Sequence, residues 1–127
     1  MSNETIYAEA FAAKFPSINL EEYFIFIEQN RLPVKQKSVT HAHHVLPQWA
    51  FPEYKDFNQN IWNRVHLSIK DHFIAHLILW KNWKHEKNAH PVLRFINFKF
   101  NLEVIENLSE EDYSLYAAAK HHHRNAV

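Results

Sequence analysis

His72 and His76 are four residues apart, a spacing that places both rings on one face of a helix, where they can bind one metal ion. The chain holds 11 histidines among its 127 residues and no cysteine, so any bound metal must be held by nitrogen and oxygen atoms. In a chain with so many histidines, a pair with this spacing is expected by chance, so the spacing alone is weak evidence for a metal site. A zinc-protease helix would also need Glu directly after the first histidine, but Phe73 stands there, which excludes that interpretation.

A second pair, His43 and His44, is adjacent in the chain. Neighbouring side chains of an extended strand point to opposite sides, so His43 could face a metal ion while His44 faces an attacking water molecule. Phosphodiester hydrolysis uses a divalent ion beside the scissile phosphate and a base of near-neutral pKa, which imidazole provides. The two histidine pairs together therefore favour metal-assisted phosphodiester cleavage.

The segment between the two pairs predicts a strand, a loop and a second strand. Residues 38–46 contain β-branched residues in rough alternation, which is typical of a short strand. Residues 47–62 hold two prolines and several aromatics, as expected of an ordered loop. A second short strand is predicted at 64–67, with Asn63 directly before it.

A helix is predicted to carry the second histidine pair. Ser68 and Asp71 have the S-x-x-D spacing of a helix start, and apolar residues then recur to about Trp83. Further helices are predicted within residues 4–30, broken at Pro16 and capped by Asn19 with Glu22, and within about 91–123, starting at Pro91 and again at a cap formed by Ser109 with Asp112. The predicted fold class is a single α+β domain over residues 1–127.

The charge is unevenly distributed although the net charge is zero. Residues 1–30 carry one lysine against five acids, residues 31–100 carry eleven Lys or Arg against four acids, and residues 101–127 carry two bases against five acids. The basic middle could attract phosphate, although an ordinary solvated surface explains the same feature about equally well.

The segments HHVLP at 43–47 and NRVHLSIKDHFIAH at 63–76 resemble the catalytic core of the HNH endonucleases, especially the small phage and homing type. The nine-residue step from Asn63 to His72 and the four-residue step to His76 both fit that pattern. The resemblance implies a ββα-metal core at about 38–84 with flanking helices on both sides.

Site residues are implied by the resemblance position by position. His43, His72 and His76 would be the metal ligands and His44 the general base. Asn63 would hydrogen-bond and orient the His44 ring, through a backbone nitrogen or carbonyl of the loop. The candidate phosphate contacts are Arg64, Lys70, Lys81 and Lys84.

The implied reaction is hydrolysis of DNA with one divalent metal ion, leaving 5′-phosphate and 3′-hydroxyl ends. Three imidazoles favour Zn²⁺, Ni²⁺ or Co²⁺ on affinity, whereas Mg²⁺ or Mn²⁺ is favoured by abundance. Cleavage of RNA would use the same residues, and a non-catalytic module with a structural metal is the competing interpretation. We expect a cytoplasmic protein of a bacterial or phage-infected cell, a monomer or small homo-oligomer, without a membrane segment.

Two features depart from the family pattern, and one further histidine is open to two interpretations. The loop QWAFPEYKDFNQN is aromatic and has no glycine, where relatives are commonly glycine-rich, and His66 takes a normally apolar place. His41 shares a strand side with His43 and could contact the site, but a surface histidine is the favoured interpretation.

Overall fold

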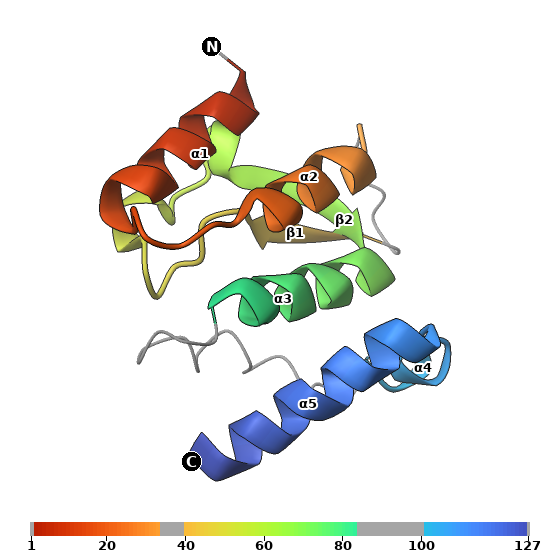
Figure 1. The fold of residues 1–127 in the computed structure, drawn as a ribbon. Coiled ribbons are helices and arrows are strands. Elements are labelled where there is room, and N and C mark those ends of the chain that lie inside the picture. Colours follow the sequence, from red (N-terminus) through yellow and green to blue (C-terminus); the bar gives the residue numbers. More distant parts are fainter. Residues whose placement is uncertain (1, 34–39, 84–100, 127) are drawn as a thin grey trace.

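The computed structural model describes residues 2–33, 40–83 and 101–126, and these form helices around a small antiparallel sheet (Figure 1). The α+β class is therefore as predicted. The elements are α1 (Asn3–Lys14), α2 (Glu21–Asn30), β1 (Thr40–His44), the 3-10 turns η1 (Pro52–Tyr54) and η2 (Ile61–Asn63), β2 (Arg64–Ser68), α3 (Ile69–Trp83), α4 (Asn101–Glu106) and α5 (Glu110–Ala126).

Two of the three predicted helix caps form. The Ser68 hydroxyl accepts a hydrogen bond from the backbone N–H of Asp71 at 3.1 Å, and Ser109 does the same for Asp112, also at 3.1 Å. Each serine thereby satisfies an N–H group that the first turn of a helix leaves without a partner. Helices α3 and α5 begin directly after these serines.

The predicted capping box at α2 is wrong. The Asn19 side chain does accept from the N–H of Glu21 at 2.8 Å, but Glu22 does not reach back to Asn19. Its carboxylate lies across from α3 and accepts hydrogen bonds from Lys81 and Asn82, both at 3.1 Å. Packing of α2 against α3 therefore decides where this side chain points.

Both predicted strands are present, and their pairing sorts the histidines onto two faces. β1 pairs antiparallel with β2, with His43 opposite Val65 and His44 opposite Arg64. Residues opposite each other share a face of the sheet, and neighbours along a strand alternate. His43 and the buried Val65 thus lie on the inner face, which packs against α3, whereas His44 and Arg64 lie on the other face. Residues 38 and 39 of the first predicted strand, and the helix start predicted at Pro91, lie outside the described residues.

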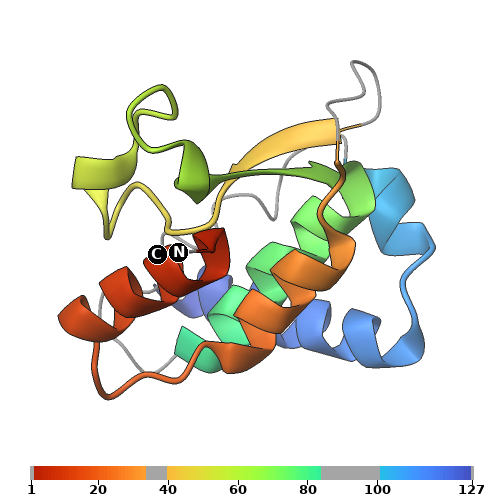
Figure 2. The same cartoon turned by 90° about the horizontal axis from the view of Figure 1, so that it is seen from above.

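Helix α3 is the centre of the packing. It contacts both strands and also α2, α4 and α5, with α2 and α5 on different sides of it (Figures 1 and 2). At its end the Trp83 ring meets Phe11 of α1 edge-on at 5.2 Å between centroids, and near its start Phe73 lies 5.8 Å from Tyr116 of α5. Such contacts on several sides leave α3 little freedom to shift against the sheet. None of the helices described here is long and apolar enough to cross a membrane.

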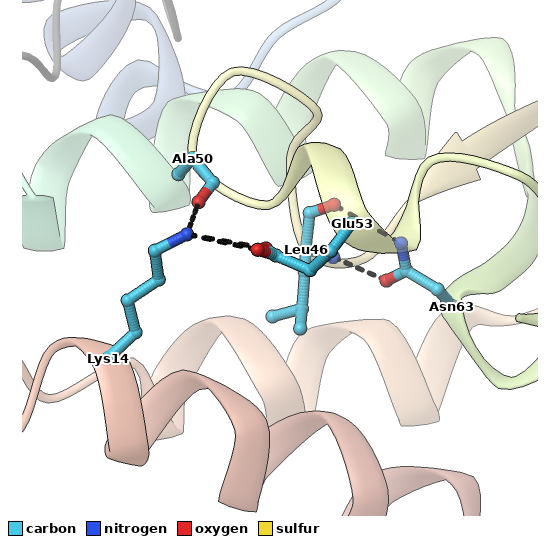
Figure 3. Close-up of polar contacts among 5 residues, drawn as sticks. All are labelled: Lys14, Leu46, Ala50, Glu53 and Asn63. Carbon is cyan, nitrogen blue, oxygen red and sulfur yellow. Dashed lines mark hydrogen bonds and ion pairs between the residues drawn. The ribbon is translucent and has the colours of Figure 1, made fainter.

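The loop between the strands is held by side chains instead of glycine turns. The Asn63 side chain is fully buried, accepts from the Leu46 N–H at 2.7 Å, and donates to the carbonyls of Leu46 at 3.3 Å and Tyr54 at 3.2 Å (Figure 3). From α1, Lys14 donates to the Ala50 carbonyl and lies 3.3 Å from the Glu53 carboxylate (Figure 3). No residue in the described ranges has a positive φ, so this loop turns without the conformation that favours glycine.

Asn63→Ala should lower the free energy of unfolding by about 3 kcal/mol, because it strands a buried N–H group and two carbonyls. Asn58→Ala, an exposed change of the same type in the same loop, should stay within about 0.5 kcal/mol of wild type. Urea unfolding of the two variants checks this. Equal stabilities of the two would show that Asn63 does not hold the loop.

Candidate metal centre and its neighbouring histidine

Three imidazoles from two elements converge between the sheet and α3. The centroid of His43, at the end of β1, lies 5.0 Å from that of His72 and 5.2 Å from that of His76. The two α3 rings are 5.0 Å apart. One nitrogen from each ring lies within 4.8 Å of the others, which makes these three a group able to hold a metal ion. Across the described parts of the chain, no fourth His, Cys, Asp or Glu belongs to this group.

The spacing of the α3 nitrogens suits a metal of tetrahedral preference. Nε2 of His72 and Nε2 of His76 are 3.3 Å apart. Two nitrogens at zinc-bond lengths of about 2.0–2.1 Å and a tetrahedral angle are separated by about 3.3–3.4 Å. This pair therefore fits a divalent ion, and His43 offers a third nitrogen within 4.8 Å.

Burial keeps two of these rings neutral. Desolvation lowers the pKa of His43 well below its ordinary value, and the charges of His76, His72 and His44 lower it further. Burial, followed by His76 and His41, lowers the pKa of His72 to about 3. A neutral imidazole has a nitrogen lone pair available, which metal binding requires. Both rings are thus in the protonation state of a ligand near neutral pH.

Two further residues contact histidines of the metal group. The Tyr23 hydroxyl of α2 lies 2.8 Å from His43 Nε2, and His41 Nδ1 lies 2.9 Å from His72 Nδ1. The favoured interpretation of His41 as a surface histidine is therefore wrong, because β1 turns it toward α3. Tyr23 was not predicted as a site residue from the sequence. A buried tyrosine usually needs a hydrogen-bond partner, but only the packing of α2 on β1 identifies that partner.

His44 lies apart from the three converging rings. Its ring stacks on Phe57, with centroids 4.1 Å apart and planes at 25°, and its Nε2 lies 2.9 Å from the Lys55 carbonyl oxygen. A carbonyl can only accept, so Nε2 must carry the hydrogen, and the neutral ring then has its lone pair on Nδ1. His44 therefore has the form of a general base held by the loop.

Asn63 makes no direct hydrogen bond to the His44 ring, so that part of the prediction is wrong, whereas the expected route through the loop backbone remains. The side-chain hydrogen bonds of Asn63 go to the backbone of Leu46 and Tyr54. Tyr54 directly precedes Lys55, whose carbonyl holds His44. Asn63 thus acts on His44 only through the shape of the loop.

The candidate phosphate contacts are unequally placed. Arg64 lies opposite His44 in the sheet register, and Lys70 is exposed in the first turn of α3, close in sequence to His72. Lys81 is engaged by Glu22 at 3.1 Å, and hydrogen bonding from Asn82 together with this lysine lowers the pKa of the Glu22 carboxyl. Lys84 lies outside the described residues. Arg64 and Lys70 are therefore the better candidates.

The metal-free protein should lose stability as the pH falls from about 7 towards 4.5. His72 titrates near 6.5 when unfolded and near 3 when folded, so the unfolded state binds more protons throughout this window. The free energy of unfolding must then decrease with decreasing pH, and His43 contributes in the same direction. Urea unfolding in a chelator checks this. His72→Gln, which cannot titrate, should show a shallower decline, and an equal slope in both chains would contradict the shift.

No protein-family model, no curated protein and no solved structure matches this chain.

Proposed function

We propose that the chain is a metal-dependent endonuclease of the HNH, or ββα-metal, kind that hydrolyses phosphodiester bonds in DNA. The observation that carries this proposal is the arrangement around the end of β1. His43 joins the two α3 histidines, while the adjacent His44 stands apart on the other side of the strand. A metal-assisted hydrolase needs this separation, because its base must stay unbound to the metal.

His43, His72 and His76 would hold one divalent ion. When bound, such an ion stabilises negative charge on the non-bridging and leaving oxygens of the phosphate. Neutral imidazole ligands favour Zn²⁺, Ni²⁺ or Co²⁺ on affinity, and Mg²⁺ or Mn²⁺ remains the choice on abundance. Burial of His43 and His72 supports the site further, since it lowers their pKa values and keeps both rings in the neutral form that metal binding requires.

His44 would activate the water. Its Nδ1 takes a proton as the water oxygen attacks phosphorus, and the bond to the 3′-oxygen breaks, so that the products carry a 5′-phosphate and a 3′-hydroxyl. The leaving oxygen takes its proton from solvent. Stacking on Phe57 and the Lys55 carbonyl hold the ring in place, so little reorganisation is needed when water attacks.

Arg64 and Lys70 would position the backbone of the nucleic acid. Arg64 shares a sheet face with His44, where a guanidinium can contact a phosphate oxygen with two hydrogen bonds. Such contacts are independent of base sequence, and RNA would fit the same groups. DNA remains the proposed substrate on the HNH resemblance of the 43–47 and 63–76 segments.

A structural metal module is the competing function. Structural zinc sites are closed by four protein ligands, whereas catalytic sites keep one position open. Three ligands with a separate His44 favour the enzyme. Burial of His44 in the core, or its inclusion among the ligands, would have favoured the module instead.

His44→Ala should reduce DNA cleavage at least about 100-fold, the usual contribution of a general base, while leaving metal binding intact. His76→Ala should weaken metal binding itself and lose cleavage with it. His121→Ala, an exposed change in α5, should alter neither. Plasmid and single-stranded DNA are assayed with Mg²⁺, Mn²⁺, Ni²⁺ and Zn²⁺, and metal affinity is measured by calorimetry.

The nuclease proposal fails if the wild-type chain binds a metal but cuts no DNA with any of these ions. Cleavage by His44→Ala at the wild-type rate would show that His44 is not the general base.

A further inference from the structure

Tyr23 makes two hydrogen bonds at the inner side of the metal group. Its hydroxyl is 2.6 Å from the Val45 carbonyl oxygen and 2.8 Å from His43 Nε2, and the side chain is fully buried. A tyrosine hydroxyl has a single hydrogen to donate. A carbonyl can only accept, and this proton must therefore go to Val45. The Tyr23 oxygen is then left to accept from Nε2–H of His43.

From this geometry we propose that Tyr23 is a positioning residue that holds His43 in its Nε2–H form, so that His43 offers Nδ1 to the metal ion. The inference rests on the metal site of the proposed function and adds the choice of ligand atom. In a neutral ring only one nitrogen has a lone pair in the ring plane, so fixing the hydrogen on Nε2 determines which nitrogen can bind.

A second histidine contact engages one of the two ring nitrogens of His72. Its Nδ1 is engaged by His41 at 2.9 Å, which leaves Nε2, and this atom faces His76 Nε2 at 3.3 Å. With Nδ1 of His72 engaged by His41, the proposed ligand atoms are Nδ1 of His43 and the Nε2 atoms of the two α3 histidines. Outer partners that hold metal-binding histidines in one tautomer typically change metal affinity about 10–100-fold when removed.

The Tyr23 contact also connects α2 to the site. Tyr23 comes from α2, whereas His43 lies near the end of β1 and Val45 directly follows this strand. The hydroxyl thus ties the N-terminal helices to the strand that carries both a ligand and the proposed base. Loss of the hydroxyl should free the His43 ring to rotate or exchange tautomers without unfolding the chain.

Tyr23→Phe should bind Zn²⁺ about 10–100-fold more weakly than wild type. Tyr7→Phe is the matched control, because Tyr7 is also fully buried and loses one hydrogen bond, from its hydroxyl to Glu28 at 2.7 Å. This control should keep wild-type affinity. Zinc affinity is measured by competition with a chromophoric chelator, and urea unfolding confirms that both variants are folded.

Nitrogen NMR of the imidazoles in the metal-free chain gives a second measurement, the tautomer of His43. A purely structural role of Tyr23 would leave this tautomer unchanged. His43 should carry its hydrogen on Nε2 in wild type and in Tyr7→Phe, and should show a mixture of tautomers in Tyr23→Phe. A wild-type His43 with its hydrogen on Nδ1, or equal zinc affinities in the two variants, would overturn the inference.

The outcomes separate this inference from the nuclease proposal. A wild-type chain that binds zinc, cuts no DNA and loses affinity on Tyr23→Phe would end the nuclease proposal and uphold the role of Tyr23. A chain that cuts DNA and whose zinc affinity is unchanged by Tyr23→Phe would uphold the nuclease proposal and overturn the role of Tyr23. A wild-type chain that binds no metal would overturn both.

Discussion

The contact between the end of β1 and one face of α3 is the interaction on which the rest of the site depends. It places the His43 ring 5.0 Å from His72 and 5.2 Å from His76, in a region where burial keeps charge off the rings. Each neutral imidazole has one nitrogen lone pair, so three such rings this close together form a group able to hold a divalent ion. The aromatic contacts at both ends of α3 hold this arrangement, because a shift of α3 along the sheet would separate the rings.

The alternation of a strand gives the two adjacent histidines different surroundings. His43 lies on the buried face and touches Tyr23, whereas His44 lies on the other face with Phe57 and the Lys55 carbonyl. The loop that supplies those contacts is itself held by Asn63, whose side chain bonds only to backbone groups in it. In this account the metal group depends on the core, and the base depends on the loop. Substitutions in the core should therefore affect metal binding, whereas substitutions in the loop should affect the proposed activation of water by His44.

Features that depend on local spacing could be predicted from the sequence. The four-residue step in α3, the alternation in β1 and the serine caps of α3 and α5 each follow from short-range geometry, and each is present. The partners of Tyr23, His41 and Asn63 could not be predicted, because they depend on how α2, β1 and the loop pack together. The same holds for Lys81, which was expected to contact phosphate and is engaged by Glu22 across the α2–α3 interface. Nuclease activity itself stays a prediction from the HNH resemblance and the geometry.

Crystallography of the zinc-loaded chain, with anomalous diffraction at the zinc edge, would show directly whether the three histidines hold one ion while His44 stays unbound. We expect one ion at about 2.0–2.1 Å from one nitrogen each of His43, His72 and His76, with no fourth protein ligand and with His44 unbound. A zinc ion bound elsewhere, or one at this place with four protein ligands including His44, would contradict this expectation.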